Sequence, residues 1–599
     1  MERPWLAQYD PGVPHQVEIP DVPFTAILER TVSRFPDVPA VYFYGHRWTY
    51  RQLDRMTNRF ANALIGLGVR PGDRVALLLP NCPQFIAAYF GAWKAGAVVT
   101  PVNPLYTPGE IAHHLNDAGA ETLVVLSRFY PRVQAVRGET PLQRVIVTEI
   151  KEYMGVPARW LYALLKERAA GDRVAVAPGD YRWRDLLRGA PDAPLSVRVG
   201  PDDLALLQYT GGTTGVPKGA MLTHRNLVAN TTQAHAWIRP VLREGEDKIL
   251  SVLPFFHLYG IAACLHLAVL LGATMILLPR WDVKEVLRTI HRLRPTLFPG
   301  VPTMYIAINH SPDLGRYDLS SLRFCLSGAA PLPAEVQQEF ERRSGSRMVQ
   351  GYGMTEASPV THLTPLVGET PLRSTGLPVP NTDVRIVDVE TGQHILPPGE
   401  EGEIIVRGPQ VMKGYWRMPT ETANVLRDGW LHTGDIGYMD ERGFLYVVDR
   451  KKDMIISGGA KVFPREVEEV LKQHPKILEV AVAGIPDPYR GETVKAWVVL
   501  KPGETATEEE FIAYFRQHLT PYKVPSEVEF RSELPKSAIG KILRRQLREE
   551  EIRKAQEAGA SQTVRSQPFV VSHGAQRSGV VRSEPRSAAE WRYRRHSTS

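Results

Sequence analysis

The stretch with the clearest chemical content is residues 209–219, which read YTGGTTGVPKG. Its glycines let backbone amides come close to an anion, its threonine hydroxyls add hydrogen-bond donors, and Lys218 adds a positive charge. The stretch follows an apolar run at 204–207 that is typical of a strand. It lacks the Gly-Lys-Ser/Thr ending of the P-loop of common ATPases, so it predicts a polyphosphate-binding loop of another kind. A plain flexible loop is the alternative.

Further side chains are suited to a nucleotide. Within residues 350–356, Tyr352 can stack on a base, Thr355 can donate to a phosphate and Glu356 can hold a magnesium ion. Farther along, Asp435 follows a glycine and can accept hydrogen bonds from both hydroxyls of a ribose. An ordinary turn is the alternative for both regions, because Gly-Tyr-Gly and an aspartate after a glycine are common in turns.

A fourth stretch, residues 534–545, places Lys541 after a glycine and before a basic helical run. A lysine on such a loop can reach outward to a negative charge. A solvated basic surface is the alternative.

The elements that must position these residues alternate along the N-terminal half. Apolar runs at 75–79, 98–99, 123–126 and 145–147 are separated by helical stretches. Continuous apolar strands between helices predict an α/β fold with mostly parallel sheets covered on both faces. After a charged junction at 450–453, shorter helical and strand-like runs predict a small α+β unit.

Two regions depart from this alternation. Residues 151–198 contain the apolar run 160–165 between basic residues, which predicts a helical insertion at the surface, with a contact to a membrane surface as the alternative. The run 258–279 carries no formal charge apart from a proton that His266 can bind, and its length would allow a transmembrane helix. Because Gly272 divides it, we expect a buried helix followed by a buried strand.

The composition of the 599 residues excludes several classes of protein. A hydrophobic fraction of 43% and a charged fraction of 23% exclude a fully disordered chain. The distant cysteines Cys82, Cys264 and Cys325 argue against a disulfide framework or a zinc site. Residues 561–599 hold seven arginines and two glutamates, so +5 of the net charge of +7 lies there. The remaining +2 on the preceding residues argues against a nucleic-acid-binding protein.

Together these stretches resemble the adenylate-forming superfamily, which includes acyl-CoA synthetases, luciferase and peptide-synthetase adenylation domains. The resemblance covers about residues 20–550. Residues 407–412, residues 448–455 and the stretch around Lys541 are similar in particular to bacterial long-chain fatty acid–CoA ligases.

The resemblance implies a large N-terminal domain over 1–449 that holds the ATP and acyl sites, and a hinge at 450–453. It also implies a small mobile C-terminal α+β domain over 454–555. We expect the basic tail at 556–599 to be disordered, because it is rich in serine and arginine and has little periodicity.

The resemblance also implies roles for the candidate residues. Lys541 would bridge the carboxylate and the α-phosphate, Glu356 would bind Mg²⁺ and Lys452 would be the hinge residue. His257 would lie near the substrate carboxylate and the thiol tunnel, with a core histidine as the alternative; with Lys541, Glu356 and Thr213 it makes up the expected catalytic set. The other implied contacts are to phosphates (Thr210, Gly211, Gly212, Thr213, Thr214, Gly215, Lys218 and Thr355), to adenine (Gly328, Ala329, Ala330 and Tyr352, with Gly353 beside them), to ribose (Asp435 and Arg450) and to the pantetheine of CoA (Gly458 and Gly459).

The implied activity is that of a long-chain fatty acid–CoA ligase. ATP and a fatty acid would give an acyl-adenylate and pyrophosphate, and CoA would then displace AMP to form a thioester. A CoA ligase for aryl or medium-chain acids is one alternative, and a non-catalytic acyl-binding or uptake protein is another. We expect a cytoplasmic protein that binds fatty acid, ATP, Mg²⁺ and CoA but no nucleic acid. Peripheral contact with membrane lipid and a homodimer remain open alternatives.

Overall fold

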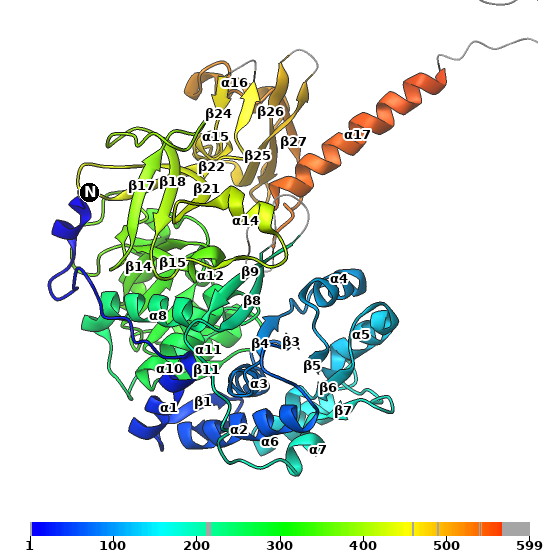
Figure 1. Ribbon diagram of the computed structural model, residues 1–599. Coiled ribbons are helices and arrows are strands. Elements are labelled where there is room, and N and C mark those ends of the chain that lie inside the picture. The colour runs from blue at the N-terminus through cyan, green and yellow to red at the C-terminus, as the bar shows by residue number, and fades with distance from the viewer. Residues whose placement is uncertain are drawn as a thin grey trace, which may run out of the picture. The chain divides into compact units, whose positions relative to one another are not determined.

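The computed structural model describes residues 3–210, 217–457, 460–487, 490–537, 540 and 542–565. The chain forms two compact units, residues 1–548 and residues 549–599. All the sheets described below lie in the first unit (Figure 1).

One sheet contains the strands that lead into and out of the glycine-rich stretch. Its order is β19-β9-β8-β4-β3-β5-β6-β7. The pairs from β8 through β7 are parallel, and the antiparallel pairs β8–β9 and β9–β19 close one edge. The strands are β3 (Arg74–Leu78), β4 (Val98–Pro101), β5 (Thr122–Leu126), β6 (Arg144–Thr148), β7 (Tyr181–Arg182), β8 (Leu204–Thr210), β9 (Lys218–Thr223) and β19 (Gly414–Tyr415).

A second sheet has the order β16-β15-β14-β13-β12-β10-β11-β1-β2. It is parallel from β14 through β1 and antiparallel at both edges. Its strands are β1 (Pro39–Phe43), β2 (His46–Thr49), β10 (Lys248–Ser251), β11 (Thr274–Leu277), β12 (Leu297–Gly300), β13 (Phe324–Ser327), β14 (Arg347–Gly353), β15 (Val360–Leu363) and β16 (Leu377–Pro378).

Two smaller sheets follow along the chain. The third is antiparallel, with β17 (Asp383–Val387), β18 (Gly402–Arg407), β20 (Leu426–Arg427), β21 (Trp430–Met439) and β22 (Leu445–Arg450). The fourth belongs to a small C-terminal domain, with β23 (Ile455–Ser457), β24 (Ala460–Val462), β25 (Ile477–Asp487), β26 (Gly491–Leu500) and β27 (Glu527–Phe530).

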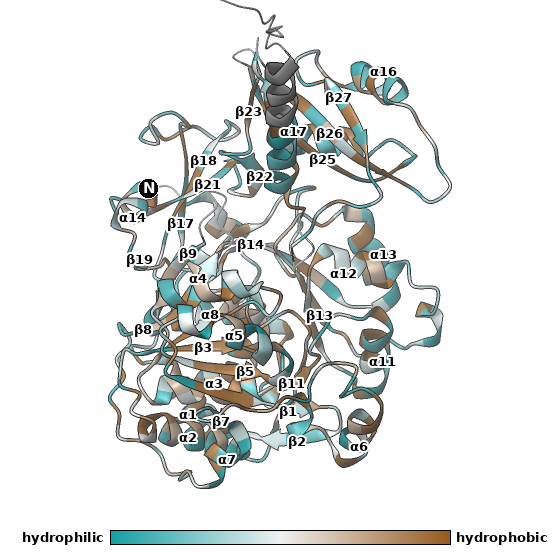
Figure 2. Cartoon of the chain, turned by 90° about the vertical axis from the view of Figure 1, so that its right-hand side faces the viewer, coloured by the Kyte–Doolittle hydropathy of each residue, from teal (hydrophilic) through white to brown (hydrophobic). Residues whose placement is uncertain are grey.

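Helices surround the large sheets, and α3 consists mostly of apolar residues (Figure 2). Every residue of α3 from Pro83 to Trp93 is buried, as expected for a helix that is apolar all round. The helices are α1 (Phe24–Arg34), α2 (Tyr50–Gly66), α3 (Pro83–Lys94), α4 (Pro108–Ala118), α5 (Tyr130–Val136), α6 (Val156–Leu165), α7 (Trp183–Arg188), α8 (His224–Ile238), α9 (Leu258–Gly260), α10 (Leu267–Leu271), α11 (Val283–Leu293), α12 (Pro302–Asn309), α13 (Ala334–Ser344), α14 (Pro419–Val425), α15 (Pro464–Leu471), α16 (Glu508–His518) and α17 (Arg544–Arg565).

The predicted fold class is confirmed: a large α/β N-terminal domain with mostly parallel sheets precedes a small C-terminal domain. The uncharged run at 258–279 forms a helical segment and then strand β11, with a π-helical turn, η6 (Ile261–His266), between α9 and α10. Within the described part of the chain, no helix has both the length and the apolarity to cross a membrane.

One expected boundary differs from the structure. Helix α17 continues to Arg565, past residue 555, where we expected the folded part to end. Residues 556–565 therefore extend a helix instead of belonging to an irregular tail. Many of the residues before this point are charged residues with high helix propensity, and they favour continuation of the helix. Residues 566–599 lie outside the described residues.

Candidate active site

Three predicted nucleotide contacts meet where β14, β21 and β22 approach one another. Asp435 and Arg450 are direct partners in the register of β21 and β22, and Arg450 Nε lies 3.4 Å from Asp435 Oδ1. Tyr352, at the end of β14, donates its hydroxyl to Asp435 Oδ2 at 2.8 Å. Burial and the neighbouring Asp435 raise the pKa of Tyr352 well above its ordinary value, so the hydroxyl stays a donor. Because Tyr352 and Asp435 lie within strands, the turn alternative is wrong for both.

Glycine is required beside Tyr352. A Cβ at Gly353 would lie 1.9 Å from the carbonyl oxygen of Pro359, closer than any side chain tolerates. This close approach lets the chain fold back from β14 into β15, which pairs antiparallel with it. The fold-back sets the entry into the short helix η8 (Thr355–Ala357), which carries Thr355 and Glu356.

The stretch predicted to face adenine follows β13 directly. At Gly328, a Cβ would lie 3.1 Å from the ring of Tyr259, so a larger residue would press on that ring. Ala329 has a φ of 68°, a left-handed conformation that is uncommon for alanine, and Ala329 and Ala330 are both exposed. The chain therefore turns sharply outward here at the carboxyl end of a parallel strand, where open α/β sheets bind ligands.

Glu356 is buried, and its carboxylate has a partner that the sequence did not point to. The hydroxyl of Tyr415 donates to Glu356 Oε1 at 2.7 Å. Burial and the Glu356 carboxylate raise the pKa of Tyr415 well above its ordinary value, so Tyr415 remains protonated. Tyr415 lies in β19, which pairs with β9, and no pattern in the sequence links it to Glu356.

Lys218 lies next to this pair. Its ammonium group is 5.3 Å from the centre of the Tyr415 ring and forms an ion pair with Glu421. Thr210 and Lys218 are opposite each other at the base of the β8–β9 hairpin. The residues on either side of the glycine-rich stretch therefore lie next to each other at the base of this hairpin. The predicted contacts Gly211, Gly212, Thr213, Thr214 and Gly215 lie outside the described residues.

Lys452 follows β22 and lies within the electrostatic reach of the site. Partial desolvation and the charge of Arg450 lower the pKa of Lys452 to about 8, although Asp453, Asp435 and Glu356 act in the opposite direction. Lys452 therefore interacts electrostatically with both Asp435 and Glu356.

The segment before Lys541 reaches the large domain. Gly540 has a φ of 74°, and a Cβ there would lie 2.8 Å from Oγ1 of Thr303 in the first turn of α12. Lys541 itself lies outside the described residues, as do Gly458 and Gly459 in the connection between β23 and β24.

His257 is half-buried and lies immediately before α9. The amide of Gln208, on β8, donates to the backbone oxygen of the preceding Phe256 at 2.9 Å. The histidine is thus held beside the strand that leads into the glycine-rich stretch.

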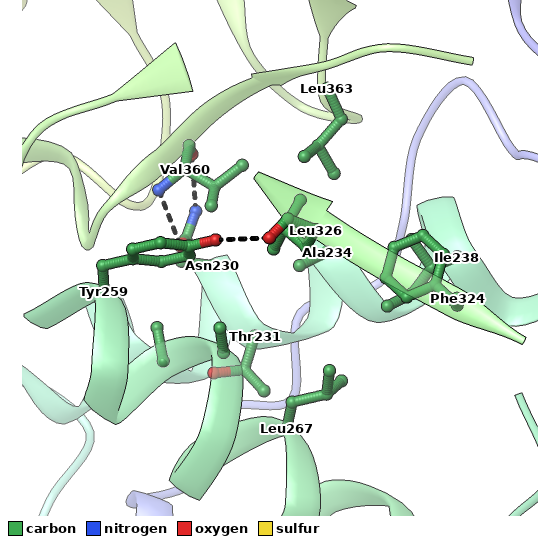
Figure 3. Close-up of a pocket in the computed structure, with 12 residues that line it drawn as sticks. Asn230, Thr231, Ala234, Ile238, Tyr259, Leu267, Phe324, Leu326, Val360 and Leu363 are labelled. Carbon is green, nitrogen blue, oxygen red and sulfur yellow. Dashed lines mark hydrogen bonds between the residues drawn. The ribbon is translucent and has the colours of Figure 1, made fainter. Parts of the chain in front are cut away.

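A cavity of about 30 Å³ lies behind Tyr259, between α8, η6 and strands β13 and β15 (Figure 3). The hydroxyl of Tyr259 donates to the carbonyl of Leu326 at 3.0 Å, and Asn230 bridges to the backbone of Val360. Apolar side chains make up most of the remaining wall. The volume admits about one methyl group or water molecule.

Comparison with known proteins places this chain in a family. A family described as "AMP-binding enzyme" matches residues 28–416. The chain belongs to this adenylate-forming family. A second match, to the "AMP-binding enzyme C-terminal domain", covers residues 466–541.

Individual members of the AMP-binding enzyme family resemble this chain along most of its length. A long-chain-fatty-acid–CoA ligase of Bacillus subtilis is 48% identical over 552 residues, which span 92% of this chain and 98% of that protein. A feruloyl-CoA synthase of an Amycolatopsis species is 41% identical over 529 residues, 87% of this chain and 97% of that protein. The crystal structure of ATP-bound MatB from Rhodopseudomonas palustris superimposes with a TM-score of 0.77 at 31% identity, covering 88% of this chain and 98% of that one.

Proposed function

We propose that this chain is an AMP-forming ligase that joins long-chain fatty acids to CoA. The observation that carries the proposal is the convergence of Tyr352, Asp435 and Arg450 beside the buried Glu356, in a chain 48% identical to a long-chain-fatty-acid–CoA ligase. Tyr352 and the turn after β13 would enclose the adenine, and Asp435 with Arg450 would hold the ribose.

The first half-reaction brings a carboxylate to the α-phosphate of ATP, so two anions must approach each other. In this proposal Lys541 lies between the carboxylate and the α-phosphate, while Thr355, Lys218 and the amides of the glycine-rich stretch bind phosphate oxygens. These donors offset the negative charge that develops as the carboxylate attacks and pyrophosphate leaves. His257 would lie beside the reacting carboxylate.

Glu356 fits a magnesium ligand. Within the described residues no group of three or more His, Cys, Asp or Glu side chains could hold a metal by itself. A single buried carboxylate is what Mg²⁺ needs when most of its other ligands are phosphates and water. The bound ion would supply positive charge at the phosphates of ATP.

In the second half-reaction the thiol of CoA attacks the acyl carbonyl and AMP leaves. We propose that residues 454–555 then turn relative to residues 1–449 about a hinge at 450–453, with Lys452 as the hinge residue. This turn would withdraw Lys541 and bring the Gly458–Gly459 loop to the pantetheine of CoA.

The test is AMP release with a series of acids from acetate to stearate, together with benzoate and ferulate, with and without CoA. The proposal predicts a CoA-dependent rate that is highest for long chains. The second candidate, an aryl-CoA ligase, rests on the 41% identity to a feruloyl-CoA synthase, and a maximum with ferulate or benzoate would favour it. AMP release from none of these acids would overturn the enzymatic proposal in favour of acyl binding or uptake.

Lys541→Ala supplies the mechanistic part of this test. We expect AMP release from free acid to fall by roughly 100-fold or more, because the charge nearest the reacting oxygens is lost. Thioester formation from presynthesised acyl-adenylate should fall much less. Lys536→Ala is a matched control on the same segment, since Lys536 pairs with Glu479. Equal losses in both half-reactions would contradict the role assigned to Lys541.

A further inference from the structure

Helix α6 presents its apolar side chains to the solvent. It spans Val156–Leu165, and none of its residues is buried. Trp160 is 74% exposed and Leu164 is 83% exposed, whereas most large apolar side chains of the chain lie in the core. Figure 2 shows α6 as a hydrophobic segment at the margin of the large domain.

The exposed side chains form one continuous stripe. They recur four residues apart, which places them on the same face of the helix. Its members are Val156, Pro157, Trp160, Leu161, Leu164 and Leu165. A stripe of this kind is ordinarily the face that a surface helix packs on the core.

The side of the helix that carries Tyr162 is held against the protein. Tyr162 donates to Asp172 and accepts a hydrogen bond from Arg128 Nη2 at 2.9 Å. Arg128 and Asp172 form an ion pair at 2.7 Å. At the start of the helix, the amide of Gly155 donates to the carbonyl of Tyr44 at 3.1 Å. These contacts fix which face of α6 points outward.

The exposed charged residues that follow the helix, up to residue 173, are all basic. The acidic side chains just after the helix, Glu167 and Asp172, are buried, and Glu167 pairs with Lys151. The exposed charged residues that follow the stripe are Lys166, Arg168 and Arg173. An outward apolar face with a basic margin is complementary to a lipid surface that carries negative charge.

We propose that α6 and the basic residues after it bind the surface of an anionic lipid bilayer. The apolar stripe enters the interface between headgroups and acyl chains, and Lys166, Arg168 and Arg173 lie at the phosphate level. The helix has ten residues, about half of what a bilayer-spanning helix needs, so it lies in the plane of the surface. This contact is independent of which acid the enzyme activates.

The test is flotation of the full chain with vesicles of phosphatidylcholine, with or without phosphatidylglycerol. The double variant Trp160→Asp/Leu164→Asp should lose at least about tenfold in partitioning, because two apolar side chains leave the interface. Val367→Asp/Leu372→Asp is the matched control, since these side chains are 76% and 71% exposed on another loop. The control should float as the unmodified protein does, and both variants should keep the unmodified thermal midpoint.

Charge is tested separately. Lys166→Gln/Arg168→Gln should weaken binding to the phosphatidylglycerol vesicles by about fivefold per residue and leave the weaker binding to pure phosphatidylcholine unchanged. A chain that ends at residue 565 should still float, which distinguishes α6 from the arginine-rich C-terminal residues.

Three outcomes would overturn the proposal. One is flotation of the α6 double variant equal to that of the unmodified chain. Another is loss of flotation on truncation at residue 565 alone. The third is an unmodified chain that does not float but is a dimer, and that becomes monomeric in the double variant, which would assign the stripe to a second copy of the chain.

Discussion

The Tyr415 hydroxyl holds one oxygen of the buried Glu356 carboxylate. A carboxylate buried in this way needs a donor on one oxygen if the other is to face a cation. Tyr415 supplies that donor at 2.7 Å, from a strand far along the chain. Lys218, over the face of the same tyrosine ring, adds positive charge nearby. The three side chains therefore form one cluster in the candidate site.

Tyr415→Phe removes this hydrogen bond and leaves the ring in place. We expect kcat/KM for Mg²⁺–ATP to fall about tenfold, since an unsatisfied buried carboxylate costs about 1–3 kcal/mol. Glu356→Gln should lower it further, because the negative charge is lost as well. The measurement is AMP release as a function of ATP and Mg²⁺ concentration.

Tyr438→Phe is the control for that change, because Tyr438 stacks on Tyr446 in the third sheet. An unchanged Mg²⁺ dependence in Tyr415→Phe would contradict the proposed role of Glu356 as a magnesium ligand held by Tyr415.

At the scale of elements, the connection between β14 and β15 positions two parts of the candidate site relative to each other. Tyr352 is the second-last residue of β14, and Thr355 and Glu356 follow in the short helix η8. The backbone at Gly353 passes so close to Pro359 that no side chain fits between them. The positions of Tyr352 and Glu356 relative to each other thus depend on a single backbone contact.

Gly353→Ala should therefore disturb stability and activity together. The added methyl group forces the two backbone segments apart, and we expect the free energy of unfolding to fall by about 2 kcal/mol or more. Urea unfolding followed by tryptophan fluorescence measures this loss. Gly138→Ala is the control, because its Cβ would meet open space, and it should change stability by less than about 0.5 kcal/mol. Equal stability of the two variants would show that the β14–β15 connection is not constrained.

Neutral histidines buried in the core make the stability of the whole molecule depend on pH. Burial lowers the pKa of His114, His266 and His362 to about 3, and that of His224 to about 4. Three of them have hydroxyl partners: His114 contacts Thr100 at 2.8 Å, His266 contacts Tyr89 at 3.0 Å and His362 contacts Thr361 at 2.9 Å. The folded chain keeps these rings uncharged at pH values where an unfolded chain protonates them.

The sign of the pH dependence follows directly. An unfolded histidine binds a proton below about pH 6.5, whereas these folded histidines do not, so stability falls as the pH drops through that value. From about pH 7.5 to about pH 5.5, each such histidine should cost ~1.4 kcal/mol. Urea unfolding at the two pH values, at constant ionic strength, measures the sum. His114→Gln should reduce the pH dependence by one such increment, and a stability that does not change with pH would contradict the buried neutral state.

The sequence by itself determined the classes of element and the chemistry available. Continuous apolar runs predicted parallel strands, because such strands are buried on both faces. The types of Tyr352, Glu356 and Asp435 predicted a nucleotide site, because ring stacking and oxygen ligation depend on local side-chain chemistry. The single residue Gly272 likewise predicted that the run at 258–279 divides into a helix and a strand.

Tertiary structure decided which of these residues meet. Asp435 faces Arg450 only through the register of β21 and β22, and Tyr415 reaches Glu356 only because β19 pairs with β9. It also turned the apolar stripe of α6 outward, whereas periodicity alone would place that stripe against the core. Helical or strand periodicity shows which side chains share a face, but it does not show which element packs on that face. The partner depends on contacts between residues distant in sequence, and those form only in the folded chain.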